Sequence, residues 1–162
     1  MYAYISLGSN LGDSAIILRS ALARLQDFSS RPILASSLWR TTPVDCPPGS
    51  PKFLNAVAAL LPRRGETPFS LLGKLRTLEN ELGRMPKKVL NEPRPLDLDL
   101  IAFGDETCDS PALTLPHPRA HLRRFVLQPL SEIAPDYILP GQGATVAELL
   151  AQLPAGESVT RI

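Results

Sequence analysis

The sequence predicts an α+β protein of the ferredoxin-like type, with helices packed mainly on one face of an antiparallel sheet and long loops that frame a site. Two observations favour this fold. Segments with strand and helix patterns follow one another in the order strand, helix, strand, strand, helix, strand. The helical segments each have one apolar stripe, which suits packing against one side of a sheet. We expect a single domain over residues 1–162.

Composition narrows the class of protein. With 44% hydrophobic residues among 162, the chain can bury a core without disulfides or structural metals. A net charge of +1 argues against a protein that coats nucleic acid or an anionic membrane. Its two cysteines have no metal-binding or redox spacing, and eighteen apolar residues never run together. We therefore expect a cytoplasmic protein without nucleic-acid or membrane partners. That it is a monomer acting on small molecules is a separate expectation, which composition does not establish.

The first half of the chain predicts three strands and a helix. Residues 2–7 are aromatic and β-branched and end at a Gly-Ser-Asn turn, which predicts a strand. Apolar residues between Ala15 and Phe28 have helical spacing, with Asp13 or Ser14 available as the N-cap. The next two apolar runs predict strands over 33–39 and 53–61, and four prolines between them predict a stiff loop over 43–51.

A second helix is predicted where Thr67 can cap Pro68 at the first helical position. Leucines then recur at helical spacing from Leu71 to Leu82, and Gly83 ends the pattern. The remaining expectations are a proline-rich loop over 84–95, a strand over 96–103, another such loop to about 118, short helical segments over 119–134, and a helix to 153 that begins with a capping box of Thr145 and Glu148.

Asp97 and Asp99 are the sharpest chemical feature. Residues two apart on a strand point to the same face, roughly 6.5 to 7 Å apart, so these carboxylates aim together. They repel one another unless a cation sits between them, and Mg²⁺ binds one or two carboxylates together with phosphate oxygens. The pair therefore suggests a magnesium-nucleotide site. A strand with one acidic, solvated face also explains such a pair when it stands alone.

Basic residues before and after this strand favour the polyphosphate interpretation. Transfer of a phosphoryl group requires both metal ions and guanidinium groups to neutralise charge on the oxygens, and the planar guanidinium holds phosphate in a fixed orientation. The basic residues are Arg84, Lys87, Lys88 and Arg94 before the strand, and Arg119, Arg123 and Arg124 after His117.

Phe53 and Asn55 form a second pair on one strand face. An aromatic plane beside an amide that donates and accepts hydrogen bonds would stack on and recognise a flat heterocycle. A core phenylalanine beside a satisfied edge asparagine is the alternative.

Taken together, six ordered motifs resemble those of the 6-hydroxymethyl-7,8-dihydropterin pyrophosphokinase family, from residue 2 to about 135. They are Tyr4 to Gly12, Arg40 to Pro43, Phe53 to Ala56, Glu79 to Arg84, Pro93 to Asp99 and Leu115 to Arg119. The resemblance implies an enzyme of folate biosynthesis that transfers pyrophosphate from ATP to the hydroxymethyl group of the dihydropterin and releases AMP.

The resemblance also implies roles for individual residues. Asp97 and Asp99 would coordinate two Mg²⁺ ions, and these two residues with Arg84 and Arg94 would be the catalytic set. The ATP-binding residues would be Glu79, Arg84, Lys87, His117 and Arg123. The pterin would be bound by Thr42, Pro43, Phe53, Asn55 and Phe125, with its ring between the two phenylalanines.

Two other functions are compatible with the sequence. One is a catalytically weakened ferredoxin-like module that binds a nucleotide or a partner. The other is nucleic-acid binding, which is the poorer choice because the basic residues are local and the RNP1 pattern is absent.

Overall fold

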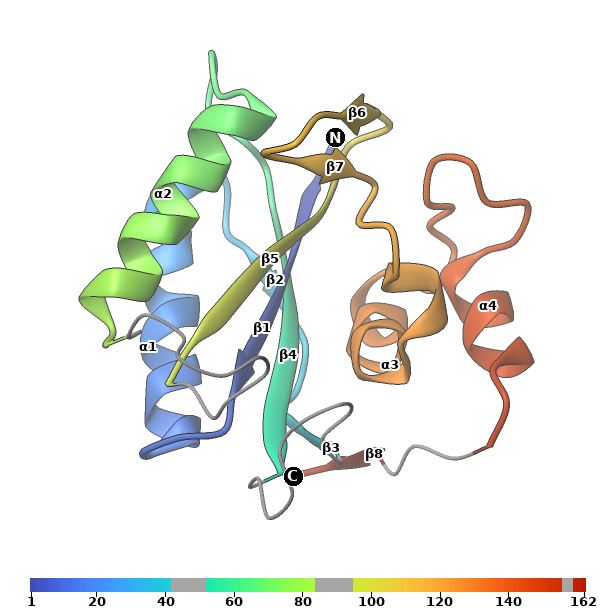
Figure 1. The fold of residues 1–162 in the computed structure, drawn as a ribbon, viewed down its shortest axis with the longest axis horizontal. Coiled ribbons are helices and arrows are strands. Elements are labelled where there is room, and N and C mark those ends of the chain that lie inside the picture. Colours follow the sequence, from blue (N-terminus) through green and yellow to red (C-terminus); the bar gives the residue numbers. More distant parts are fainter. Residues whose placement is uncertain (42–51, 84–94, 156–158) are drawn as a thin grey trace.

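A computed structural model describes residues 1–41, 52–83, 95–155 and 159–162, which form an antiparallel sheet between two layers of helices (Figure 1). The central strand β1 (Ala3–Ser9) pairs with β4 (Phe53–Leu60) on one side and with β5 (Asp97–Phe103) on the other. The strand order is β5-β1-β4-β3-β8, and every pair is antiparallel.

Short strands complete the sheet. β3 (Trp39–Thr41) pairs with both β4 and β8 (Val159–Arg161), and β2 (Leu34–Ala35) also pairs with β4. A separate two-stranded ribbon contains β6 (Cys108–Asp109) and β7 (Thr114–Leu115).

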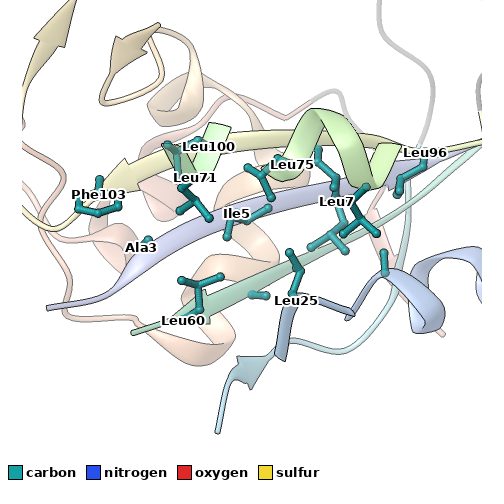
Figure 2. Packing of buried hydrophobic residues seen from close by; sticks show 14 of the residues in the cluster. Ala3, Ile5, Leu7, Leu25, Leu60, Leu71, Leu75, Leu96, Leu100 and Phe103 are labelled. Carbon is teal, nitrogen blue, oxygen red and sulfur yellow. The ribbon is translucent and has the colours of Figure 1, made fainter. Parts of the chain in front are cut away.

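Helices α1 (Ser14–Leu25) and α2 (Pro68–Glu81) cover one face, as the sequence predicts (Figure 1). Asp13 caps α1, which continues into a 3₁₀ turn over Gln26–Phe28. Their leucines interlock with alternate residues of the strands (Figure 2). The cluster includes Ile5, Leu7, Leu25, Leu60, Leu71, Leu75 and Phe103. Burying this apolar area is the main favourable term for this layer.

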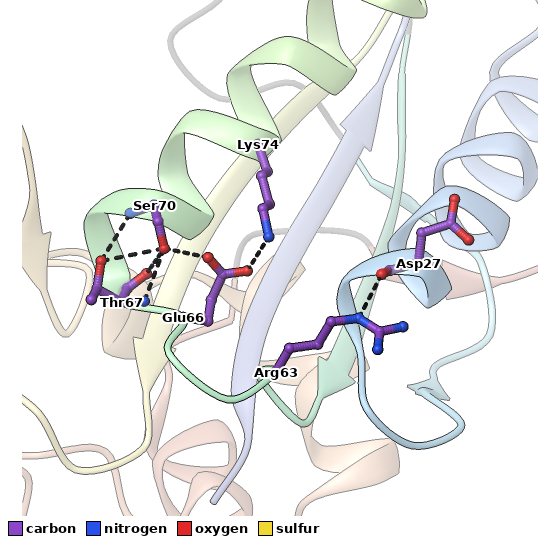
Figure 3. A network of polar contacts seen from close by, with 6 residues as sticks. All are labelled: Asp27, Arg63, Glu66, Thr67, Ser70 and Lys74. Carbon is purple, nitrogen blue, oxygen red and sulfur yellow. Dashed lines mark hydrogen bonds and ion pairs between the residues drawn. The ribbon is translucent and has the colours of Figure 1, made fainter.

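Polar contacts fix the start of α2 (Figure 3). Thr67 and Ser70 form a capping box, and the Ser70 hydroxyl also donates to Glu66. Glu66 in turn accepts a hydrogen bond of 2.7 Å from Lys74. The capping box satisfies backbone donors that the first turn of a helix leaves without partners, and the bonds of Glu66 hold this turn from the side.

Helices also cover the second face of the sheet, whereas the sequence predicts helices mainly on one face. This layer consists of a 3₁₀ turn over Ala120–Leu122, α3 (Arg124–Ile133) and α4 (Val146–Gln152). Its apolar side chains pack on Tyr4, Val57 and Ile101, which point away from the first core. Because the central strands are apolar on both sides, both faces require cover.

Some elements differ from the sequence prediction. The segment expected as one strand over 33–39 is divided into β2 and β3. Between them Ser36 bonds Val57 twice, since its N–H donates to the Val57 carbonyl and its hydroxyl oxygen accepts from the Val57 N–H, each at 2.9 Å. The sequence does not predict strand β8 or the β6–β7 ribbon, because strands of two or three residues are too short to show an alternation of apolar and polar residues.

No helix in the described part of the chain is long and apolar enough to cross a membrane. The antiparallel α+β architecture predicted from the sequence is confirmed.

Candidate active site

Gly8 of β1 joins two candidate binding groups. It is the Cα partner of Asn55 on β4 and of Asp97 on β5. Directly opposed residues of antiparallel strands project to the same face. Asn55 and Asp97 therefore lie on one face, two strand spacings or about 10 Å apart. The predicted heterocycle pair and the predicted carboxylate pair are thus neighbours.

The absence of a side chain at Gly8 leaves room for its neighbours. A Cβ atom at this position would lie 3.1 Å from Nδ2 of Asn55 and 3.6 Å from the Phe53 ring. A larger residue would push the amide or the ring aside. Gly8 therefore lets Phe53 and Asn55 approach the β1 backbone.

Hydrogen bonds orient the buried amide of Asn55. Its Oδ1 atom accepts a hydrogen bond of 2.6 Å from the Thr41 hydroxyl. Its Nδ2 atom donates at 3.5 Å to the Leu7 carbonyl. The amide is therefore held by strands on both sides of β4.

Asp99 lies in a buried environment beside the Asp97 carboxylate. Burial and, next, the charge of Asp97 raise the pKa of Asp99 to about 6, against the opposing charges of Arg76 and Arg123. Burial and a neighbouring carboxylate both disfavour the charged form of a carboxyl group, and a nearby cation would favour it. Such a pair suits a divalent cation that is completed by phosphate oxygens and water. Among the described residues no cluster of three or more His, Cys, Asp or Glu could hold a metal by itself.

His117 lies beside this pair and is neutral at pH 7. Burial, together with the charges of Arg123 and Arg119, lowers its pKa to about 4 against the charge of Asp97. The Nδ1 atom accepts from the Arg119 N–H at 3.2 Å. In a neutral imidazole whose Nδ1 accepts, the proton is on Nε2. His117 can therefore donate one hydrogen bond to an anion through Nε2.

Arg123 and Phe125 come from the start of α3. The Arg123 guanidinium stacks over the Phe125 ring at 5.3 Å from its centroid. The charge of Arg123 also acts on both Asp99 and His117, so this residue is close to the aromatic ring and to the charged groups. The start of α3 thus contributes a cation and an aromatic plane on the face that carries Asp97.

Comparisons with known proteins decide the family. The model of the family described as 7,8-dihydro-6-hydroxymethylpterin-pyrophosphokinase (HPPK) matches residues 4–135. The chain belongs to this family.

Relatives and solved structures of the HPPK family agree. The chain is 38% identical over 152 residues to the 2-amino-4-hydroxy-6-hydroxymethyldihydropteridine pyrophosphokinase of Pseudomonas aeruginosa, covering 93% of this chain and 91% of the relative. The protein of the same name from Bacillus subtilis is 40% identical over 132 residues, which are 81% of this chain and 77% of that one. The resemblance inferred from the sequence motifs is therefore confirmed.

A structural match supports the fold. The wild-type HPPK-DHPS of Plasmodium falciparum with pteroate superposes with a TM-score of 0.74 at 14% identity. The match covers 93% of this chain and 44% of that one, so this chain spans less than half of the solved protein.

Arg76, which the sequence did not single out, lies beside the candidate site. Arg76 donates to both Glu79 and the Leu98 carbonyl at 2.8 Å, and Glu79 also accepts from the Leu98 N–H. Glu79, expected near the nucleotide, is thus buried against the backbone between the two aspartates. The spacing of Arg76 and Glu79 on one helix is typical of an ion pair, but nothing in the sequence indicates their contact with β5.

Five predicted site residues lie outside the described residues: Arg84, Lys87 and Arg94 among the cations, and Thr42 and Pro43 at the expected pterin pocket. Their roles remain predictions.

Proposed function

We propose that this protein transfers the pyrophosphoryl group of ATP to the hydroxymethyl group of 6-hydroxymethyl-7,8-dihydropterin, giving the pterin diphosphate and AMP in folate biosynthesis. Membership of the HPPK family supports the reaction. One structural observation supports it: Gly8 pairs with both Asn55 and Asp97. The heterocycle and the polyphosphate would then lie side by side on one sheet face.

Asp97 and Asp99 would hold Mg²⁺, which we propose as two ions. When bound, Mg²⁺ neutralises phosphate charge and makes a coordinated hydroxyl more acidic. The protein contributes two carboxylates whose directions are set by one strand. The raised pKa of Asp99, caused by burial and by the charge of Asp97, supports this assignment because a bound cation would offset both effects.

Arg123 and His117 would bind the triphosphate. Neutral His117 donates from Nε2, and the guanidinium of Arg123 supplies positive charge beside it. Arg84, Lys87 and Arg94 would add further cations, and Glu79 would act at the nucleotide side of the site. The catalytic set would remain Arg84, Arg94, Asp97 and Asp99.

The pterin would stack on Phe53 and Phe125 while Asn55 bonds its edge, with Thr42 and Pro43 as lining residues. In the transfer, the hydroxymethyl oxygen loses its proton and bonds to the β-phosphorus, the bond from that phosphorus to the α–β bridging oxygen breaks, and AMP and the proton are released. Because both substrates would be held on one sheet face, the two reacting groups would already be close and oriented, which lowers the entropic cost of the transfer.

The proposal includes a single-domain monomer that works in the cytoplasm on these two small molecules. The molar mass in solution, measured by light scattering with and without ATP, tests the monomer.

AMP release tests the activity. The protein is incubated with MgATP and the dihydropterin, and AMP is quantified by chromatography. We expect AMP in proportion to pterin diphosphate, none in EDTA, and a loss of several orders of magnitude in Asp99→Asn. The same change at the exposed Asp109 is the control. Well-folded protein that forms no AMP would overturn the proposal.

A further inference from the structure

Strand β5 is held at one residue by side chains from α2. In the described sheet β5 is an edge strand, paired only with β1. The Leu98 N–H donates to Oε2 of Glu79 at 2.7 Å, and the Leu98 carbonyl accepts from Nη1 of Arg76 at 2.8 Å. The helix thus supplies a donor and an acceptor that a neighbouring strand would otherwise provide.

The two side chains also bind one another. Nη1 of Arg76 donates to Oε1 of Glu79 at 2.8 Å, so each oxygen of the Glu79 carboxylate accepts a hydrogen bond. The Glu79 side chain is 2% exposed and that of Arg76 is 47% exposed. A buried carboxylate held by short, charge-assisted bonds is costly to displace. The contact therefore has one preferred geometry.

The residue that is held lies between the two aspartates. Leu98 is buried, and its backbone angles determine the directions of Asp97 before it and Asp99 after it. Like charges on those neighbours repel one another and favour their separation. A contact that fixes the middle residue resists that separation and keeps both carboxylates on one face.

We propose that Arg76 and Glu79 are positioning residues that fix the Asp97-Leu98-Asp99 segment for binding of a divalent cation with a polyphosphate. The inference rests on the proposed function, since that function places the cation at Asp97 and Asp99. Neither residue needs to touch the cation. They act through the Leu98 backbone, as outer partners of metal ligands commonly do.

The test combines two measurements on four variants. Arg76→Met keeps an apolar stem and removes the donor, Arg76→Lys keeps a charge, and Glu79→Gln removes the carboxylate charge. Glu81→Gln is the control, because Glu81 on the same helix forms a surface ion pair with Arg24. Amide exchange by NMR reports on Leu98 in metal-free protein. Calorimetry measures the affinity for α,β-methylene ATP in Mg²⁺ and in EDTA.

In Arg76→Met and Glu79→Gln, we expect amide exchange at Leu98 to be faster than in the wild-type protein, and to increase more than exchange at Val57 does. The gain in analogue affinity that Mg²⁺ provides should fall about 10- to 100-fold in both variants, as for other outer partners of metal ligands. Arg76→Lys should recover part of this gain, and Glu81→Gln should keep all of it. A merely structural role would lower Tm without changing the gain.

The outcomes separate the two proposals. If the wild-type protein releases AMP and gains affinity with Mg²⁺, while Arg76→Met and Glu79→Gln keep that gain, the positioning role is wrong and the function stands. If the wild-type protein binds the analogue equally in Mg²⁺ and EDTA and forms no AMP, both proposals fail.

Discussion

The Thr41 hydroxyl donates a hydrogen bond of 2.6 Å to Oδ1 of Asn55, and both residues are buried. The bond crosses from β3 to β4, although Thr41 pairs with Phe53 in the strand register. It therefore fixes which edge of the Asn55 amide faces β3 and which faces β1. A group that recognises a ligand by hydrogen bonds depends on such an orientation.

Thr41→Val should lower both stability and pterin affinity. Valine has nearly the same shape but leaves Oδ1 of Asn55 without its donor, at a cost of about 1 to 3 kcal/mol for a buried acceptor. Urea unfolding measures the first effect and titration with the dihydropterin the second. Thr160→Val on exposed β8 is the control. Unchanged pterin affinity in Thr41→Val would show that Asn55 needs no orientation.

Phe53→Ala should weaken pterin binding and leave the binding of an ATP analogue nearly unchanged. Loss of an aromatic contact costs about 1 to 2 kcal/mol, roughly a 5- to 30-fold change in Kd. Phe53→Tyr keeps the ring and should bind normally. Phe69→Ala removes a half-exposed ring at the start of α2 and serves as the control. Equal loss of both ligands in Phe53→Ala would contradict a stacking role.

Asp99→Asn should abolish most AMP formation while raising the stability of the metal-free protein. The raised pKa of Asp99 means that burial and Asp97 make its negative charge unfavourable in the folded state. A neutral amide removes that penalty, so Tm in EDTA should rise by about a few degrees. Differential scanning calorimetry checks this, and a lower Tm would show that Arg76 and Arg123 already compensate the charge.

The sequence predicts pairs within one strand better than relations between strands. The period of two places Asp97 with Asp99 and Phe53 with Asn55. It does not predict that Gly8 lies between these pairs, because register depends on how distant strands are aligned. Nor does it predict that Arg76 reaches Leu98, since side chain to backbone bonds leave no periodic pattern.

Glu132 should make the stability of the fold depend on pH. Partial burial raises the pKa of this α3 carboxylate, but hydrogen bonds from the Ser37 hydroxyl and N–H and from the Trp39 indole outweigh burial and lower the pKa below its ordinary value of 4.5. The folded state then binds a proton less readily than the unfolded state. Its stabilising contribution is complete above pH 4.5 and is lost as pH falls through the lowered pKa.

Comparison of the wild-type protein with Glu132→Gln isolates this contribution. Above about pH 5 the wild type should be more stable by a constant amount, about 1 kcal/mol, because the carboxylate is largely solvated. Below pH 4.5 the difference should shrink, since protonated glutamate and glutamine are then both neutral. Urea unfolding at pH 7, 5, 4 and 3 measures it. A difference that stays constant to pH 3 would show that the charge of Glu132 does not hold α3 to the segment from Ser37 to Trp39.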